Sequence, residues 1–378
     1  MATNKVLLVI ASQDFVSANH KLLWKLFSQM DDYAVIVANI PADQVVCRLK
    51  NKTYRIADAK KGPEVINERL TVFRPLLTVR AEIAPSFTYP LIAKQMWNSI
   101  KKFRPTIMTE HVDLLVYNAL WVPILKGTHP DMKIGYYLFD EVRNNGADNT
   151  IDKQRYYFDE IACKQSDAIF TMTKMLADSR AEYNSNIKVV GNGALVPASF
   201  AKPDVIFPKS IAFIGNLRDW FDEELFELLV TKRPDITFVF VGPVEDNMNQ
   251  YLNSLLNKYL NVVYFGKVKK ENMPTLYRMF SGVIIPYRKN PFIQATRPIK
   301  IVESVMSGTP VVSIPVDGYQ EGEFIRFAKS VEEFSEQIDY IINNPIEFSS
   351  SAYKDFANNN SWNHIAYTII NSFKKDIK

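Results

Sequence analysis

The chain has 378 residues, of which 47% are hydrophobic and 23% charged, enough apolar material for the cores of two ordinary domains. Its net charge is only +4 and it has no RNP-type aromatic motif or zinc finger, so nucleic-acid binding is not expected. No apolar run approaches the roughly 20 residues of a membrane span, and the start lacks the pattern of a signal peptide. Cys47 and Cys163 form no CxxC or Cys/His pattern, which disfavours a zinc site or disulfide framework. We therefore expect a cytoplasmic protein.

Short apolar runs rich in β-branched residues alternate with helical stretches through the first half. They predict strands at residues 6–11, 34–40, 70–75, 106–109, 133–139 and 168–172. Nearly continuous hydrophobicity is typical of parallel strands that are covered on both faces. The first half therefore predicts a doubly wound α/β domain.

The pattern restarts in the second half, with strands predicted at residues 210–215, 237–242, 262–266, 282–286 and 311–314. The proline-rich segment 197–208 between the two halves is typical of a linker. We expect two Rossmann-like domains, residues 1–197 and 198–360, followed by a closing helix in residues 361–378 that packs back on the first domain.

Glycines follow two of the second-half strands, at Gly215 and Gly242. In a doubly wound sheet the ligand crevice opens at the carboxyl ends of the strands, so both glycines are candidate binding positions. No GxGxxG follows the first strand and no GxxxxGK[ST] occurs. Dehydrogenase-type dinucleotide binding and P-loop phosphoryl transfer therefore lose their main support.

Residues 296–316 join a charged helix start to a small-residue turn and a buried strand. Pro298 suits the first turn of a helix. Arg297 and Lys300 add positive charge at a helix start, which already attracts anions, and Glu303 one turn later can accept hydrogen bonds from sugar hydroxyls. Alternatively, these charged residues only cap and solubilise a helix.

This segment resembles the donor-binding signature of the group 1 (family 4) glycosyltransferases, a Pro-x-Lys-x-x-Glu helix followed by a small-Gly-x-Pro-Val-Val turn and strand. The resemblance is specific over the second half and looser over the first. It implies the GT-B fold, two Rossmann-like domains facing across a cleft, with the nucleotide on the second domain and the acceptor on the first. It also implies that Glu303 holds the ribose. Many members carry a second glutamate eight residues earlier, where this chain has Ala295.

The leaving diphosphate of a sugar nucleotide gains negative charge as the sugar–oxygen bond breaks, and cations must meet that charge. Lys300 and Arg297 are the first candidates, followed by Arg218 beyond Gly215. The alternative for Arg218 is a surface ion pair with Asp219 or Asp222. Because no Asp-x-Asp is present, we expect a metal-independent enzyme without a cofactor.

The acceptor hydroxyl needs a route for its proton, and a carboxylate or histidine at a strand end can supply one. Asp140 follows the strand-like run KIGYYLF, and His111 ends the run PTIMTEH, so both are catalytic candidates. Alternatively, Asp140 or Glu141 is a helix N-cap or a partner of Arg143. The family resemblance implies retention at the anomeric carbon, whereas a true base at Asp140 would favour inversion.

The expected function is transfer of a sugar from a nucleotide-sugar to a lipid-linked or glycan acceptor in bacterial surface polysaccharide synthesis. We expect the transferred sugar to be a hexose. The resemblance favours a UDP-linked donor. The alternatives are a catalytically degenerate GT-B scaffold in a glycan assembly complex and a GT-B epimerase. Basic and aromatic residues at 20–27 and 97–104 predict weak peripheral contact with the inner face of the membrane, or only solvated helix edges.

Overall fold

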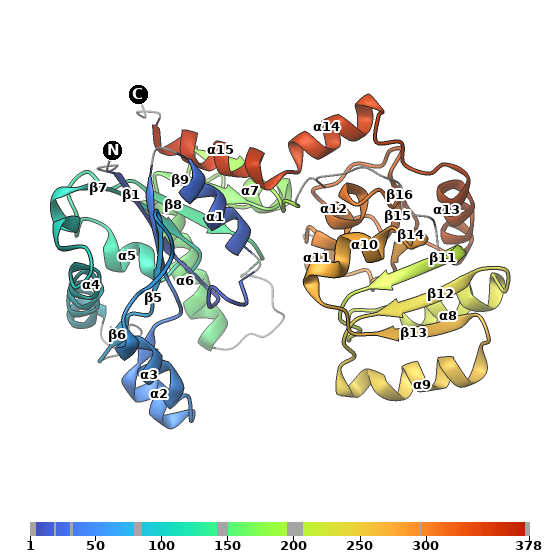
Figure 1. The fold of residues 1–378 in the computed structure, drawn as a ribbon, viewed down its shortest axis with the longest axis horizontal. Coiled ribbons are helices and arrows are strands. Elements are labelled where there is room, and N and C mark those ends of the chain that lie inside the picture. Colours follow the sequence, from blue (N-terminus) through green and yellow to red (C-terminus); the bar gives the residue numbers. More distant parts are fainter. Residues whose placement is uncertain are drawn as a thin grey trace. The chain divides into compact units, whose positions relative to one another are not determined.

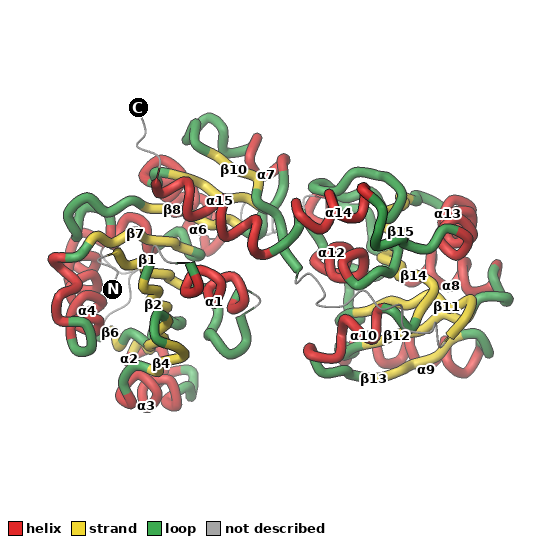
Figure 2. Tube along the Cα trace, turned by 45° about the horizontal axis from the view of Figure 1, so that its top comes forward, coloured by secondary structure: helices red, strands yellow, loops and turns green. Residues whose placement is uncertain are grey.

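The computed structural model describes residues 5–18, 20–30, 33–78, 85–141, 150–194, 207–294 and 296–374. The chain forms two compact units, one of residues 1–190 with 365–378 and the other of residues 191–364. In each unit, helices lie on either side of a largely parallel sheet (Figure 1 and Figure 2). The boundary predicted between residues 197 and 198 lies outside the described residues, as does most of the predicted linker.

The sheet of the first unit has the strand order β10-β9-β8-β7-β1-β2-β5-β4, and its strands pair in parallel except for β4 with β5. Its central strand, β1 (Lys5–Ile10), is buried from Val6 onward between β2 and β7, which accounts for its unbroken apolar sequence. The other strands of this sheet are β2 (Ala34–Ala38), β4 (Glu64–Asn67), β5 (Leu70–Phe73), β7 (His111–Val116), β8 (Ile134–Leu138), β9 (Ala168–Thr171) and β10 (Ile187–Val189). A small parallel pair is formed by β3 (Ala42–Asp43) and β6 (Leu76–Leu77).

One predicted strand is wrong. Residues 106–109 belong to the 3₁₀ helix η1 (Pro105–Thr109), and the strand begins two residues later with β7. Pro105 stands at the start of the helix, where its missing N–H costs nothing. The shift matters because it moves His111 from the end of a strand to the beginning of one.

Helices α1 and α4 of the first unit bury apolar side chains in its core. In α1, Leu23, Trp24 and Phe27 are buried, and in α4 Trp97 and Ile100 are buried. The aromatic residues of the segments 20–27 and 97–104 thus largely face the core. The α-helices of the first unit before α15 are α1 (Lys21–Gln29), α2 (Gln44–Leu49), α3 (Thr53–Lys61), α4 (Pro85–Lys101), α5 (Trp121–Leu125), α6 (Thr150–Gln165) and α7 (Lys174–Asp178).

The last described helix, α15 (Trp362–Lys374), packs on the first unit from Ile365 onward. Its Phe373 ring lies 6.3 Å from that of Phe170 in β9, and Lys133 Nζ donates to the carbonyl oxygen of Phe373 at 3.0 Å. Ile365, Ile369 and Phe373 recur at helical spacing and are buried. No helix in the described part of the chain has the length and apolar character that a membrane crossing requires.

The sheet of the second unit has the order β13-β12-β11-β14-β15-β16 and is parallel throughout. Its core includes the buried runs Ile211–Ile214 and Val283–Ile285 on the two strands that flank the point where the strand order reverses. The strands are β11 (Phe207–Ile214), β12 (Thr237–Val241), β13 (Val262–Gly266), β14 (Phe280–Ile285), β15 (Val311–Ser313) and β16 (Ile325–Phe327).

The helix of the signature segment, α12 (Ile299–Met306), has Pro298 as its N-cap and ends before Gly308. Gly308 has φ +89°, and a β-carbon there would lie 2.3 Å from the Phe348 ring, so the turn requires glycine. The other helices are α8 (Glu223–Lys232), η2 (Asp246–Met248), α9 (Asn249–Lys258), η3 (Lys270–Asn272), α10 (Met273–Tyr277), α11 (Pro291–Gln294), α13 (Val331–Asn343) and α14 (Ser351–Asn359).

Candidate active site

Three glycines stand at the carboxyl ends of neighbouring strands in the second unit. The Gly215 N–H donates to the Val241 carbonyl at 2.8 Å, and the Gly242 N–H donates to the Gly266 carbonyl at 2.8 Å. A β-carbon on Gly242 would lie 2.1 Å from the Gly215 carbonyl oxygen. Only glycine permits this approach of two backbones. The sheet edge beside the switch point between β11 and β14 therefore carries no side chains at these glycines.

Lys300 lies at that switch point. Its Cε is 2.0 Å from the position of a β-carbon on Gly215, and its Nζ donates to the Tyr287 hydroxyl at 3.2 Å. Tyr287 follows β14, so Lys300 lies between the ends of the two strands that bound the crevice. The structure therefore brings together Lys300 and Gly215, two residues that the sequence analysis gave separately as donor-binding candidates.

Glu303 lies one helical turn after Lys300, on the same face of α12. The Tyr277 hydroxyl donates to its Oε2 at 3.2 Å. Burial raises the pKa of the Glu303 carboxyl, an effect that the positive charges of Lys270 and Lys300 and the bond from Tyr277 oppose. Lys300 and Glu303 thus present a cation and a carboxylate at one sheet edge.

Arg297, at the start of the signature helix, contacts several groups of the second unit. Its guanidinium donates to Asn360 Oδ1 at 2.5 Å and lies 4.7 Å from the centre of the Tyr319 ring. Asn192 Nδ2 donates to the Arg297 carbonyl at 2.6 Å, and a β-carbon on Gly191 would overlap the guanidinium. These contacts show that Arg297 joins the chain at residues 191–192 to the segment before α15, and its contact with the donor diphosphate stays a prediction.

Arg218 is also engaged by neighbouring side chains. It forms ion pairs with Asp219 at 3.4 Å and Glu245 at 3.3 Å, and its guanidinium lies 3.8 Å from the centre of the Trp220 ring. The alternative of a surface pair with Asp219 is therefore confirmed. Asp222 instead caps α8 by accepting from the Leu225 N–H. Ala295 lies outside the described residues.

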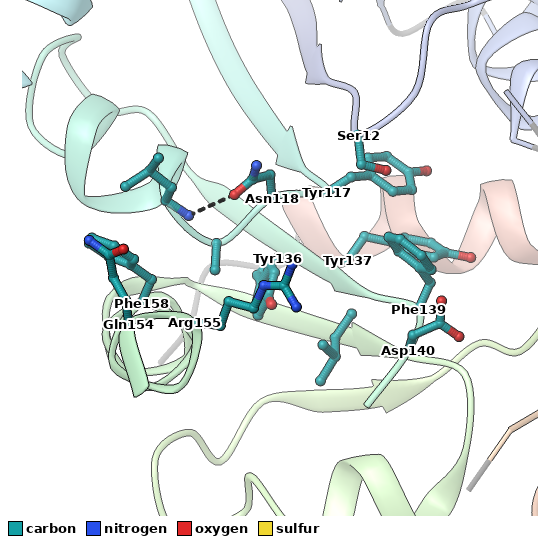
Figure 3. Close-up of a pocket in the computed structure, with 13 residues that line it drawn as sticks. Ser12, Tyr117, Asn118, Tyr136, Tyr137, Phe139, Asp140, Gln154, Arg155 and Phe158 are labelled. Carbon is teal, nitrogen blue, oxygen red and sulfur yellow. Dashed lines mark hydrogen bonds between the residues drawn. The ribbon is translucent and has the colours of Figure 1, made fainter. Parts of the chain in front are cut away.

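Asp140 lines a cavity of about 390 Å³ in the first unit (Figure 3). It follows β8, and the cavity wall combines the ends of β1, β7 and β8 with one side of α6. Tyr117 and Tyr137 stack with ring centres 4.7 Å apart, which gives the cavity an aromatic wall. Ser12, Asn118, Gln154 and Arg155 add polar groups, a combination that suits a sugar or another small polar ligand.

Removal of water by the surrounding protein raises the pKa of the Asp140 carboxyl to about 6. Asp140 is exposed to solvent, and a pKa of about 6 leaves its carboxyl largely ionised at neutral pH. An ionised carboxylate whose pKa lies near the working pH is suited to accept a proton.

The turn that carries Asp140 is fixed by a buried arginine that sequence analysis missed. Arg180, fully buried, donates to both carboxylate oxygens of Glu141 at 2.6 and 2.7 Å and also pairs with Asp159 at 3.1 Å. Tyr136 donates to Asp159 Oδ1 at 3.0 Å. Glu141 therefore has a partner 39 residues away, and its predicted partner Arg143 lies outside the described residues.

His111 is not near Asp140, and the prediction that it is a second catalytic candidate is wrong. It begins β7 and pairs in register with Lys5 at the start of β1, which places it at the amino edge of the sheet. Asp140 follows the carboxyl end of β8, at the opposite edge. The His111 Nε2 instead lies 3.1 Å from Asp113 Oδ2, which also accepts from the Tyr33 hydroxyl.

Sequence comparison finds a match for most of the second unit. Residues 208–344 match the family model described as Glycosyl transferases group 1. The matched residues all lie within the second unit. Over 102 residues the chain is 30% identical to TuaH of Bacillus subtilis, named a teichuronic acid biosynthesis glycosyltransferase, and this match covers 27% of the chain. The match spans about a quarter of the length of TuaH, 25%.

Solved structures extend the likeness beyond the residues that the family model matches. HepE of Anabaena, crystallised with UDP and glucose, superimposes with a TM-score of 0.63 at 12% identity, over 98% of this chain and 99% of HepE. TarM superimposes with a TM-score of 0.65 at 10% identity over 99% of both chains. The lipopolysaccharide outer core galactosyltransferase WaaB gives 0.63 at 9% identity, over 98% of this chain and 99% of WaaB. These likenesses show the GT-B fold.

Proposed function

We propose that this protein transfers a sugar from a UDP-linked donor to a glycan acceptor during synthesis of a bacterial surface polysaccharide. The observation that carries the proposal is Lys300 over Gly215 with Glu303 one turn further on, at the switch point of the sheet and within the residues that match the family model. Complexes of HepE with UDP and glucose support a UDP-sugar, and the name of TuaH supports a cell-surface glycan. The finer proposal is a hexose and a lipid-linked acceptor, handled at the inner face of the membrane.

The donor half of the proposal assigns one task to each residue. Lys300 and the first N–H groups of α12 balance the charge of the diphosphate, which grows as the leaving group departs. Glu303 accepts hydrogen bonds from the ribose hydroxyls, while Tyr277 holds its carboxylate in place. With the cation supplied by Lys300, we propose that transfer proceeds without a metal ion.

The acceptor half assigns the Asp140 cavity to the sugar or hydroxyl that receives the new bond. The acceptor oxygen bonds to the anomeric carbon, the UDP oxygen leaves with the electron pair of the broken bond, and the acceptor proton must go to a base. In an inverting reaction Asp140 takes that proton; in a retaining one the donor phosphate takes it and Asp140 stabilises positive charge on the sugar. In both cases Asp140 acts as a carboxylate, which its pKa of about 6 permits at neutral pH.

Titration calorimetry with UDP, GDP and ADP tests the donor assignment. UDP should bind, the Lys300→Ala and Glu303→Ala variants should bind it more weakly, and the affinity should be unchanged by a metal chelator. A protein that binds none of the three nucleotides contradicts the proposal. Loss of UDP binding on chelation would overturn metal independence alone.

A further inference from the structure

Positive charge is concentrated on helices α2 and α3 of the first unit. Residues 44–61 contain six lysine or arginine residues and one aspartate, a net charge of +5, although the whole chain carries only +4. The single aspartate, Asp58, is already paired with Arg74 at 2.7 Å. The charge is therefore gathered in one short segment and not spread evenly along the chain.

The same two helices expose apolar side chains to solvent. Leu49 is 80% exposed, Tyr54 59% and Val45 49%. None of the residues of α3 is buried, and α2 is anchored mainly through the buried Cys47 and its cap at Asp43. Figure 1 shows α2 and α3 next to each other at one end of the first unit. We call the exposed surface formed by Val45, Arg48, Leu49, Lys50, Lys52, Tyr54, Lys60 and Lys61 the α2–α3 face.

A cavity of about 290 Å³ lies under this face and leads toward the proposed acceptor site. Lys50, Lys52 and Arg55 line it. Asn118 and Leu120 line both this cavity and the one that holds Asp140. A phosphate-bearing group bound by the basic residues would therefore sit next to the cavity assigned to the acceptor.

The exposed apolar and basic residues of the α2–α3 face indicate what kind of partner it binds. The free energy falls when exposed apolar side chains leave water, and it falls again when lysine and arginine side chains approach anionic phosphates. An acidic protein could satisfy the charges, but Leu49 and Tyr54 are exposed in a segment rich in cations and do not line the cavity, a pattern suited to the fluid interface of a bilayer.

We infer that the α2–α3 face docks the protein on an anionic phospholipid surface, with Leu49 and Tyr54 entering the interface and the basic residues contacting lipid phosphates. This inference rests on the proposed lipid-linked acceptor and says where that acceptor's membrane is met. We assign the membrane contact to this face in place of the segments 20–27 and 97–104, whose aromatic residues largely face the core.

Sedimentation of the full chain with vesicles tests the inference. Vesicles of phosphatidylglycerol mixed with phosphatidylcholine should bind the protein at low salt, and vesicles of phosphatidylcholine alone should not. The double variant Lys50→Ala/Lys52→Ala should weaken partitioning about 30-fold, which corresponds to about 1 kcal/mol for each basic residue. Leu49→Ser should weaken it about tenfold through lost apolar contact.

Two matched controls locate the effect. Lys101→Ala/Lys102→Ala removes two adjacent exposed lysines from the segment 97–104 of the same unit, and Leu260→Ser removes a fully exposed leucine from the second unit. Both should partition like the unchanged protein. UDP affinity should be the same in all four variants, which separates failure of this inference from failure of the donor assignment. Equal binding to both vesicle types, binding to neither, or unchanged partitioning of the Lys50→Ala/Lys52→Ala and Leu49→Ser variants would overturn the inference.

Discussion

The side chain of Lys300 fills the space that a β-carbon on Gly215 would need, with only 2.0 Å between that position and Lys300 Cε. A glycine at the end of β11 is therefore what allows a lysine from α12 to reach the switch point of the sheet. The two residues are 85 positions apart in the chain, and Lys300 occupies the space that the missing side chain of Gly215 leaves free.

We expect Gly215→Ala to displace Lys300 and to lower UDP affinity about tenfold, the effect of about 1.4 kcal/mol. The methyl group meets the lysine stem, and φ +156° at this position adds backbone strain. Calorimetry measures the change. Gly127→Ala is the control because its φ is +72° but no atom lies within 4 Å of the new β-carbon. Equal UDP affinities for the two variants would show that Lys300 is not held by Gly215.

Lys300→Ala should lower turnover more than donor affinity, because the leaving diphosphate carries more charge in the transition state than in the bound donor. Steady-state kinetics and UDP titration on the same preparation separate the two effects. Equal losses in kcat and in affinity would indicate that Lys300 only binds the donor.

Glu303→Ala should weaken UDP binding by roughly 1–3 kcal/mol, since it removes a charged hydrogen-bond acceptor. Tyr277→Phe removes only the bond that holds the Glu303 carboxylate, so its effect should have the same direction and be smaller. If both variants bind UDP as the unchanged protein does, Glu303 is only a residue of the helix.

Arg297→Ala should act on stability. The guanidinium holds Asn360 and the chain at Gly191, so its loss should lower the free energy of unfolding of the second unit by about 1.5–3 kcal/mol. Lys232→Ala, which removes an exposed ion pair with Glu332, should cost less than about 1 kcal/mol. Denaturant unfolding compares them. A stable Arg297→Ala protein with impaired turnover would support the predicted contact with the diphosphate.

Asp140→Asn should reduce transfer about 100-fold or more while UDP binding stays nearly unchanged. In the unchanged protein, kcat/KM should rise with pH through about 6, because the carboxyl must lose its proton before it can act. The variant should lose that limb of the profile. His111→Asn, at the other edge of the sheet, should keep the limb and nearly all activity. Full activity of Asp140→Asn would move proton transfer to the donor phosphate.

Local sequence was sufficient for much of this protein. Unbroken apolar runs predicted the buried parallel strands, because a central strand such as β1 needs apolar side chains on both faces. The signature helix and its Gly308 turn were equally readable, because caps and turns depend on neighbouring residues. Lys300, Glu303 and Asp140 were proposed as site residues from the sequence and from the family resemblance, and their roles stay predictions.

Only the tertiary structure decided which side chains contact one another. β7 begins at His111, five residues after the predicted start at residue 106, which places His111 at the opposite edge of the sheet from Asp140, and no local pattern could reveal this. Arg180 reaches Glu141 across 39 residues and Arg297 reaches Asn360 across 63, so neither role could be predicted from neighbouring residues. The structure also decides which apolar residues are exposed. Trp24 faces the core and Leu49 faces solvent, although both are large apolar residues beside basic ones in the sequence. Which face of a helix meets the core depends on where the whole sheet lies, and that follows only from the folded chain.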